Sequence, residues 1–278
     1  MYPRLLHIYG PVWIHSYGVM IAIGFALFLF LTHRHIKKLK LMSENIFFNM
    51  ILVGLISGII GGRLFFVISE WNNFSSNYLD FFYPWVGGFG VLGSIIAILA
   101  TVSIYLKINK INILPIFDVV SIYAPLLQSI SRLGCFFAGC CYGNKVNCDF
   151  IFAIKFSSLN GLAPINVWLH PTQLYSAIAS LGIFLIMYLS SKYFYDTSLI
   201  QKSKQCQSQL ICLKKNGHLI FLYLILESTS RFFIDFWRGD RNLVNLNLLN
   251  VNLSFSQITA ICLFVFSFLS FILILKKK

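Results

Sequence analysis

Two short stretches of the sequence carry polar side chains inside or against long apolar segments: residues 170–175 (HPTQLY) and residues 231–238 (RFFIDFWR). A charged or amide side chain inside a bilayer costs free energy, so such residues usually serve a function. Arg231 lies within the apolar stretch 219–237 and Arg132 within 126–138, so neither guanidinium reaches a bilayer surface cheaply. Arginines in such positions usually pair with an anion or line a wet cavity, which makes both arginines candidate functional residues.

The composition indicates which kind of protein must hold these residues. With 58% hydrophobic and 11% charged residues, the 278-residue chain does not describe a soluble domain. We therefore predict an all-α polytopic membrane protein, one integral-membrane domain over residues 1–278. Apolar runs long enough to cross the hydrocarbon layer predict seven spans, at 15–32, 46–68, 87–106, 113–137, 172–190, 218–237 and 255–275. The N-terminal segment lacks the pattern of a removable signal, so we expect the first span to remain.

The placement of basic residues predicts the orientation, because short cytoplasmic loops retain Lys and Arg. The basic residues that follow the first, third, fifth and last predicted spans all fall on one side: Arg34, Lys37, Lys38, Lys40, Lys107, Lys110, Lys192, Lys202, Lys204, Lys214, Lys215, Lys276, Lys277 and Lys278. The N-terminus is therefore expected outside and the C-terminus in the cytoplasm. The net charge of +13 is then a topology signal with contact to anionic lipid, and it gives no reason to expect nucleic-acid binding.

Two polar segments between the spans are long enough to have a character of their own. Residues 191–217, rich in Ser, Gln and Lys, predict a cytoplasmic loop. Residues 139–170 form the one long outside segment and predict a small extracytoplasmic cap of turns and short strands. The absence of an internal repeat in the sequence argues against the inverted-repeat design of many transporters.

Four cysteines, Cys135, Cys140, Cys141 and Cys148, cluster within a short stretch. Thiolates can hold a metal ion, or outside the cell can form a disulfide such as Cys140 or Cys141 with Cys148. The spacing fits no familiar zinc motif and no histidine lies nearby in the sequence, so small packing residues are the favoured interpretation and no metal is predicted.

Two glycine-rich runs allow close backbone approach, either for helix packing or for lining a cavity: Gly61-Gly62 in the second span and residues 87–93, which begin with Gly87 and Gly88. Arg63 follows Gly62 directly. A packing seam gains nothing from a guanidinium, so Arg63 is expected to face an anion or another acceptor.

On the predicted topology, all of these polar sites lie in the outer half of the bilayer or at its outer surface. Singly, Tyr17 is typical of an interfacial anchor, Gln173 of a hydrogen bond between helices, and His170-Pro171 of a helix start. Together they predict a cavity open to the outer leaflet, basic from Arg132, Arg231 and Arg238 and partly balanced by acidic residues. A phospholipid head group is the local anion that suits such a cavity.

Three motifs resemble those of a known family, the bacterial prolipoprotein diacylglyceryl transferases, and the resemblance extends over nearly the whole chain. The most specific, residues 170–175, is similar to the family's His-Pro-Ser/Thr-Gln-Leu-Tyr motif. Residues 131–143 (SRLGCFFAGCCYG) resemble its Gly-Arg-x-x-Asn/Cys-Phe-x-x-Gly signature, and residues 231–238 its Arg-Phe-x-x-Glu-x-x-Arg segment.

The resemblance implies transfer of the diacylglyceryl group of phosphatidylglycerol to the lipobox cysteine of a prolipoprotein signal peptide, at the outer leaflet of the bacterial cytoplasmic membrane. Membrane lipid and the prolipoprotein are the implied partners, with no cofactor. It implies that Arg132 and Arg231 bind the head-group phosphate, that Asp235 orients an arginine, and that Tyr17 and His170 contact the substrate, while Gly143 shapes the outer cap. The wider set of substrate-binding residues that it implies is Arg63, Gly87, Gly88, Cys135, Gly143, Gln173, Tyr175, Asp235 and Arg238.

The chain departs from the family pattern at several positions. Where many members have a histidine, often assigned as the base, this chain has Leu92, and Asn144 replaces an arginine that follows the second signature glycine. Ser131 stands for a glycine and Asp235 for the usual Glu. Two other functions therefore stay open: a catalytically silent relative that binds lipid or lipoprotein, and a lipid transporter or scramblase using the same cavity.

Overall fold

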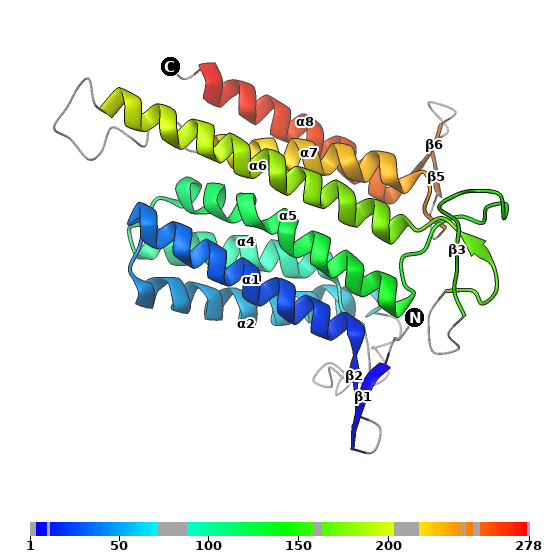
Figure 1. The fold of residues 1–278 in the computed structure, drawn as a ribbon. Helices are drawn as coiled ribbons and strands as arrows, with labels where there is room; N and C mark the ends of the chain where they lie inside the picture. The colour runs from blue at the N-terminus through cyan, green and yellow to red at the C-terminus, as the bar shows by residue number, and fades with distance from the viewer. Residues whose placement is uncertain are drawn as a thin grey trace. The chain divides into compact units, whose positions relative to one another are not determined.

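The computed structural model describes residues 4–9, 12–71, 88–157, 163–202, 217–239, 241, 243–246 and 251–276. Over these residues the chain is mostly helical, with three two-stranded antiparallel sheets (Figure 1). The helices are α1 (Ser16–Leu39), α2 (Glu44–Ser69), α4 (Val91–Ile108), α5 (Ile113–Ala138), α6 (Thr172–Lys202), α7 (His218–Asp235) and α8 (Phe255–Lys276).

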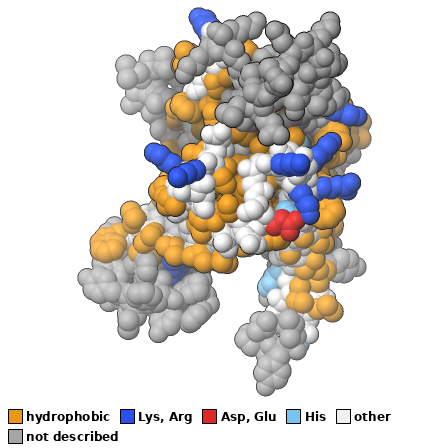
Figure 2. Space-filling view, turned by 90° about the vertical axis from the view of Figure 1, so that its left-hand side faces the viewer, with side chains coloured by type: hydrophobic (Ala, Val, Ile, Leu, Met, Phe, Trp, Pro, Cys, Tyr) orange, Lys and Arg blue, Asp and Glu red, His pale blue; other side chains and the backbone are white. Residues whose placement is uncertain are grey.

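Within the described ranges, six of these helices are long and apolar enough to cross a membrane, and α7 is the exception. That helix includes three charged residues, Glu227, Arg231 and Asp235. The protein is therefore a multi-pass membrane protein, as predicted, with each expected span found as a helix. Large hydrophobic side chains such as Phe266 and Leu273 of α8 are exposed, as expected for surfaces that face lipid. Figure 2 shows hydrophobic side chains at the surface together with Lys and Arg side chains.

The helices correct one predicted boundary, and they show the fourth predicted span as a single helix. The loop expected at residues 191–217 begins too early, because α6 continues beyond its apolar part to Lys202. Residues 203–216 of that loop lie outside the described residues. The fourth predicted span, interrupted by prolines in the sequence, is one continuous helix with Pro125 in its interior.

The strands form three short hairpins. β1 (Arg4–Tyr9) pairs with β2 (Val12–His15), β3 (Ile154–Lys155) with β4 (Trp168–Leu169), and β5 (Leu243–Leu246) with β6 (Val251–Ser254). In the β3–β4 pair, Ile154 lies opposite Leu169, and a small core of Phe156, Ala163 and Leu169 packs behind it. The described parts of the segment 139–170 therefore contain turns and two short strands.

The described chain divides into two compact units, residues 33–116 and residues 1–32 with 117–278. In the first unit, α2 and α4 run antiparallel along a seam of small residues. A Cβ added to Gly61 would lie 2.3 Å from the Cβ of Ala97, and the Ser94 hydroxyl donates a hydrogen bond to the Gly58 carbonyl at 2.9 Å. Helix packing, one of the two interpretations of these glycines, is therefore correct for Gly61.

In the second unit, α7 packs against both α6 and α8, and a buried carboxylate joins α5 to the start of α7. Asp118 of α5 accepts hydrogen bonds from the backbone N–H of Gly217 at 2.6 Å and of Ile220 at 2.9 Å. The first N–H groups of a helix have no partner within the helix, so this carboxylate caps α7. A polar residue that seemed to interrupt a span thus fixes where the arginine-bearing helix begins.

Candidate functional site

A small polar cavity opens among α5, α6, α7 and the turn that follows α7, with a volume of about 30 Å³. Ten side chains line it: Gln128, Arg132, Ser176, Ser180, Glu227, Ser230, Arg231, Ile234, Asp235 and Arg238. The volume admits about two water molecules.

The sequence predicted four charged residues for this site: Arg132, Arg231, Asp235 and Arg238. Three of them are arginines, whose guanidinium groups donate hydrogen bonds. Arg132 and Arg238 lie close enough to Arg231 for their charges to interact with it. The lining holds these three guanidinium groups against two carboxylates, Glu227 and Asp235. A cavity with this charge balance favours an anion, and the planar donors of arginine suit a phosphate.

One of the two carboxylates is held by a neighbouring amide. The Gln128 side chain donates a hydrogen bond to Oε1 of Glu227 at 2.5 Å, across a sequence separation of 99 residues. The other carboxylate oxygen, Oε2, is buried and has no hydrogen-bond partner among the described residues. Glu227 therefore offers an acceptor beside the arginines.

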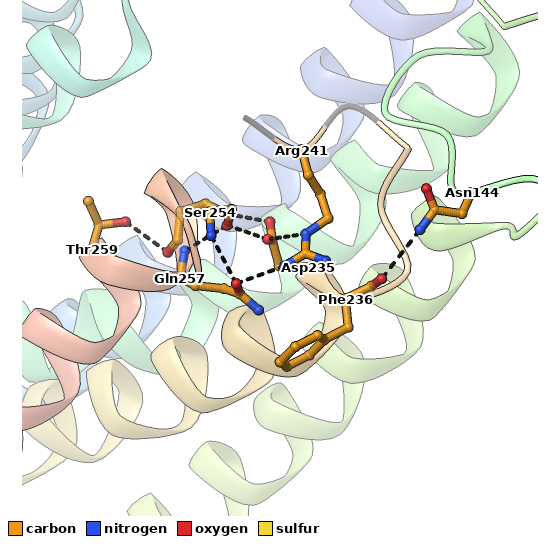
Figure 3. Close-up of polar contacts among 8 residues, drawn as sticks. Asn144, Asp235, Phe236, Arg241, Ser254, Gln257 and Thr259 are labelled. Atoms are coloured by element: carbon orange, nitrogen blue, oxygen red, sulfur yellow. Dashed lines mark hydrogen bonds and ion pairs between the residues drawn. The ribbon is translucent and has the colours of Figure 1, made fainter. Parts of the chain in front are cut away.

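The other carboxylate, Asp235, is 4% exposed and is held by a polar cluster at the start of α8 (Figure 3). The hydroxyls of Ser254 and Ser256 both donate hydrogen bonds to it, and Arg241 forms an ion pair with it at 3.4 Å. Asp235 thus pairs with Arg241, a residue outside the motif, and its expected role of orienting an arginine stays a prediction.

Arg241 also donates a hydrogen bond to Oε1 of Gln257 at 2.9 Å, and Gln257 is fully buried. The same amide oxygen accepts from the backbone N–H of Ser254, whose hydroxyl accepts from the backbone N–H of Gln257. This reciprocal pair is a capping box that starts α8. It fixes the end of α7, and therefore Arg231 and Arg238, to α8.

The motif at residues 170–175 ties three segments together. Gly143 donates its backbone N–H to the carbonyl of His170 at 3.0 Å, and Asn144 donates its backbone N–H to the carbonyl of Trp237 at 2.8 Å. A Cβ on Gly143 would lie 2.5 Å from the Cβ of His170 and 2.7 Å from the Trp237 carbonyl oxygen. Only glycine fits at this crossing, which agrees with the expectation that Gly143 shapes the cap.

The aromatic side chains of the motif face the same place, where Gly143, His170 and Trp237 meet. Nδ1 of His170 lies 3.2 Å from the Tyr175 hydroxyl, and the Tyr175 ring meets that of Trp237 edge to face. Burial lowers the pKa of His170 from its ordinary value, so its imidazole is neutral at neutral pH. A neutral imidazole has one N–H donor and one acceptor nitrogen, so His170 can donate one hydrogen bond and accept another.

The structure brings together only part of the predicted site. Arg132, Arg231, Asp235 and Arg238 line the cavity, whereas Tyr17, Cys135, Gly143, His170, Gln173 and Tyr175 are not among its lining residues. Tyr17, in the first turn of α1, packs beside Gly134. Gln173 is 1% exposed and uses its amide on the carbonyl of Cys140.

Three predicted positions belong to the other compact unit or lie outside the described residues. Arg63 donates a hydrogen bond to the Gly88 carbonyl at 3.1 Å, which confirms that it faces an acceptor. Leu92 is half exposed at the start of α4. Gly87 lies outside the described residues.

Sequence reasoning missed Arg241, Gln128 and the pairing of Asp235 with two serines, because these contacts join residues far apart in the chain. The disulfide that the sequence left open is not formed in the structure, where Cys135, Cys140, Cys141 and Cys148 are free thiols.

Comparisons with known proteins agree with the motifs. The family model described as prolipoprotein diacylglyceryl transferase matches residues 3–273. The phosphatidylglycerol–prolipoprotein diacylglyceryl transferase of Clostridium tetani is 32% identical over 270 residues, which cover 96% of this chain and 97% of that protein. The corresponding enzyme 2 of Clostridium perfringens is 32% identical, over 82% of this chain and 80% of its own length. That of Clostridium botulinum strain Loch Maree is 34% identical, over 86% of both chains. The chain belongs to the prolipoprotein diacylglyceryl transferase family.

Proposed function

We propose that this protein transfers the diacylglyceryl group of phosphatidylglycerol to the lipobox cysteine thiol of a prolipoprotein. The observation that carries the proposal is the convergence of Arg132, Arg231 and Arg238 on one cavity. The names of the clostridial relatives, with which the chain aligns over most of its length, support the same reaction.

The reaction suits a site built from guanidinium donors. The thiolate of the substrate attacks the glyceryl carbon, a C–S bond forms, and the C–O bond to the phosphate breaks. The electron pair leaves with the glycerol phosphate, so negative charge grows on the phosphate oxygens. Fixed donors in a cavity of low dielectric stabilise such charge more in the transition state than in the ground state. We assign this role to Arg132 and Arg231, with Arg238 beside them.

The remaining predicted residues receive roles around this centre. Tyr17 and His170 contact the substrate, and the His170–Tyr175 pair and Gly143 shape the entrance. Asp235 acts through Arg241 and the start of α8, and therefore positions α7. The resemblance also implies substrate binding by Arg63, Gly87 and Gly88, and this stays a prediction.

The proposal includes a topology. The N-terminus lies outside and the C-terminus in the cytoplasm of the bacterial inner membrane, with the cavity open to the outer leaflet. Residues 139–170 are the extracytoplasmic cap, and the chain forms one integral-membrane domain. A secreted signal peptide and a phospholipid head group meet only at that surface.

The test is transfer by the purified protein in vesicles of phosphatidylglycerol, with a peptide that carries a lipobox cysteine. The expected result is a peptide that gains one diacylglyceryl group through a thioether, with one glycerol phosphate released per transfer. A peptide with serine in place of the cysteine is the matched control and should gain nothing. A correctly folded protein that transfers nothing, or that releases glycerol phosphate without modifying the peptide, contradicts the proposal.

A further inference from the structure

Three thiols meet beside the cavity. The sulfur atoms of Cys135, Cys140 and Cys141 all lie within 4.8 Å of one another. Cys135 is 6% exposed in the last turns of α5, and the other two follow the end of that helix. None of the roles assigned above uses these sulfurs.

The chain reversal that brings them together is a helix C-cap. Gly139 has a φ of +71°, its N–H donates to the Phe136 carbonyl, and the N–H of Cys140 donates to the carbonyl of Cys135. This pattern is a Schellman motif, in which a left-handed glycine turns the chain back over the last helical turn. The turn places Cys140 and Cys141 next to Cys135.

The backbone of the two later cysteines is held from outside the cluster. Gln173 donates its side-chain amide to the Cys140 carbonyl, and Thr172 donates its hydroxyl to the Cys141 carbonyl, both at 2.8 Å. Cys141 itself adopts a φ of +56°, a left-handed conformation that L side chains rarely take. These contacts hold the backbone of Cys140 and Cys141 without using a sulfur atom, while the Cys140 thiol itself donates to the Cys135 carbonyl oxygen at 3.7 Å.

The arrangement suits a thiophilic cation. In a tetrahedral zinc site with Zn–S bonds of about 2.3 Å, the sulfurs lie ~3.8 Å apart, so the three thiols need to close by no more than about 1 Å. Structural zinc sites use four protein ligands, whereas catalytic sites use three and leave a position for water or substrate. Among the described residues, this group holds three thiols and no fourth protein ligand, which matches the second pattern.

The cluster also adjoins the cavity. Arg132, which lines the cavity, precedes Cys135 by one helical turn on α5. Both Arg132 and Arg238 lie close enough to Cys141 to interact with it electrostatically. A ligand bound to these sulfurs is therefore next to the donors assigned to the phosphate.

We propose that Cys135, Cys140 and Cys141 bind a thiophilic divalent cation, zinc or a close analogue, and that the substrate cysteine occupies its fourth position as a thiolate. The role of the fourth position rests on the proposed function, whereas the metal site does not. On coordination the substrate thiol gives its proton to solvent. The sulfur lone pair then forms the bond to the glyceryl carbon, and the phosphate leaves with the electron pair of the broken C–O bond. The oxidation state of the metal does not change.

Metal binding is measured first, without turnover. The purified, reduced protein is stripped with a chelator and titrated with Co²⁺, whose thiolate charge-transfer and visible bands report sulfur ligation and tetrahedral geometry. We expect one ion per chain, displaced by Zn²⁺. Single Cys→Ser substitutions at 135, 140 and 141 should abolish the bands, whereas Cys148→Ser and Cys262→Ser, at exposed positions, should leave them unchanged. Thermal melting of each variant checks that it is folded.

A folded, reduced parent protein that shows no thiolate–cobalt bands overturns the proposal, as does a disulfide within the three cysteines of the protein isolated from cells. Addition of a lipobox peptide should shift the cobalt bands, and its serine counterpart should not. Equal spectra with the two peptides overturn the ligation of the substrate thiol.

Transfer assays separate this proposal from the proposed function. If coordination supplies the thiolate, the Cys→Ser variants lose about tenfold in rate at a pH of about 7.5, and the loss shrinks as the pH rises and the free thiol ionises. A parent protein that binds metal but transfers nothing refutes the proposed function and leaves the metal site intact. Variants that transfer at the parent's rate at every pH refute the role of the metal and leave the proposed function intact.

Discussion

The side-chain amide of Gln173 donates a hydrogen bond to the backbone carbonyl of Cys140 at 2.8 Å, joining the first turn of α6 to the chain that follows α5. Thr172 makes the equivalent bond to Cys141. The most specific motif of the sequence is therefore, in part, a device that positions the segment next to the arginines. Because Gln173 is almost fully buried, an apolar replacement removes this donor from the Cys140 carbonyl.

Replacing Gln173 with leucine should destabilise the protein by about 1–3 kcal/mol, the range for a buried polar group that loses its partner. The measurement is thermal or denaturant unfolding in detergent. Thr259→Ala is the control, because the Thr259 hydroxyl bonds only a carbonyl of its own helix, that of Ser256. Equal stability of the Gln173 variant and the parent would remove the positioning role.

Gly143→Ala should be more harmful than any other glycine substitution near the cap. The added Cβ would meet the Cβ and carbonyl oxygen of His170 and the carbonyl oxygen of Trp237, all within 2.7 Å, and backbone atoms cannot yield cheaply. Overpacking of this kind costs about 1–3 kcal/mol. Gly182→Ala, in α6 with nothing within 4 Å of its Cβ position, should leave stability unchanged or raise it slightly. The free energies of unfolding of the two variants, each compared with that of the parent, test this prediction.

Arg231→Lys and Arg132→Lys should remain folded in the membrane and yet lose most of the transfer activity, because a lysine cannot reproduce the planar, bidentate donors of arginine. The loss of one such donor from a charge-stabilising site is typically about 10²- to 10³-fold. Arg34→Lys, at an exposed position of α1, is the control and should keep the parent's rate. Near-full rates in both cavity variants would show that the phosphate binds elsewhere.

The presence of Leu92 in place of the family histidine should not silence the enzyme. General-base assistance is often worth about 10²- to 10⁴-fold, but a cysteine thiol is already partly ionised. With a pKa near 8.5, roughly a tenth is thiolate at a pH of about 7.5, so full deprotonation gains only about tenfold. We expect measurable transfer at a pH of about 7.5, and a smaller effect from Leu92→His than from Arg231→Lys. Activity that is absent even at a pH of about 8.5 and appears only with Leu92→His would identify a catalytically silent relative.

The proposed orientation can be tested with a membrane-impermeant thiol reagent. A cysteine introduced at Asn160 should react from outside in intact cells, and one at Ser203 should react only after permeabilisation. Labelling is measured against the parent protein, which carries its own cysteines. The reverse pattern would place the cap in the cytoplasm and remove the argument for a secreted peptide substrate.

The sequence by itself determined where the helices lie and which arginines matter, because both follow from local chemistry. An apolar run of sufficient length has few alternatives to a membrane helix, and a guanidinium within it needs a partner. The motifs at 170–175 and 231–238 identified the family for the same reason: each is contiguous in the chain.

Only the tertiary structure decided which polar groups meet. Asp235 finds Ser254 and Arg241, and Asp118 finds the start of α7 across 99 residues, contacts that no local pattern specifies. The three thiols meet because a left-handed Gly139 reverses the chain and α6 holds the result in place. When helices pack, each buried donor and acceptor needs a hydrogen-bond partner. Which partner it finds depends on the whole fold and not on any one segment.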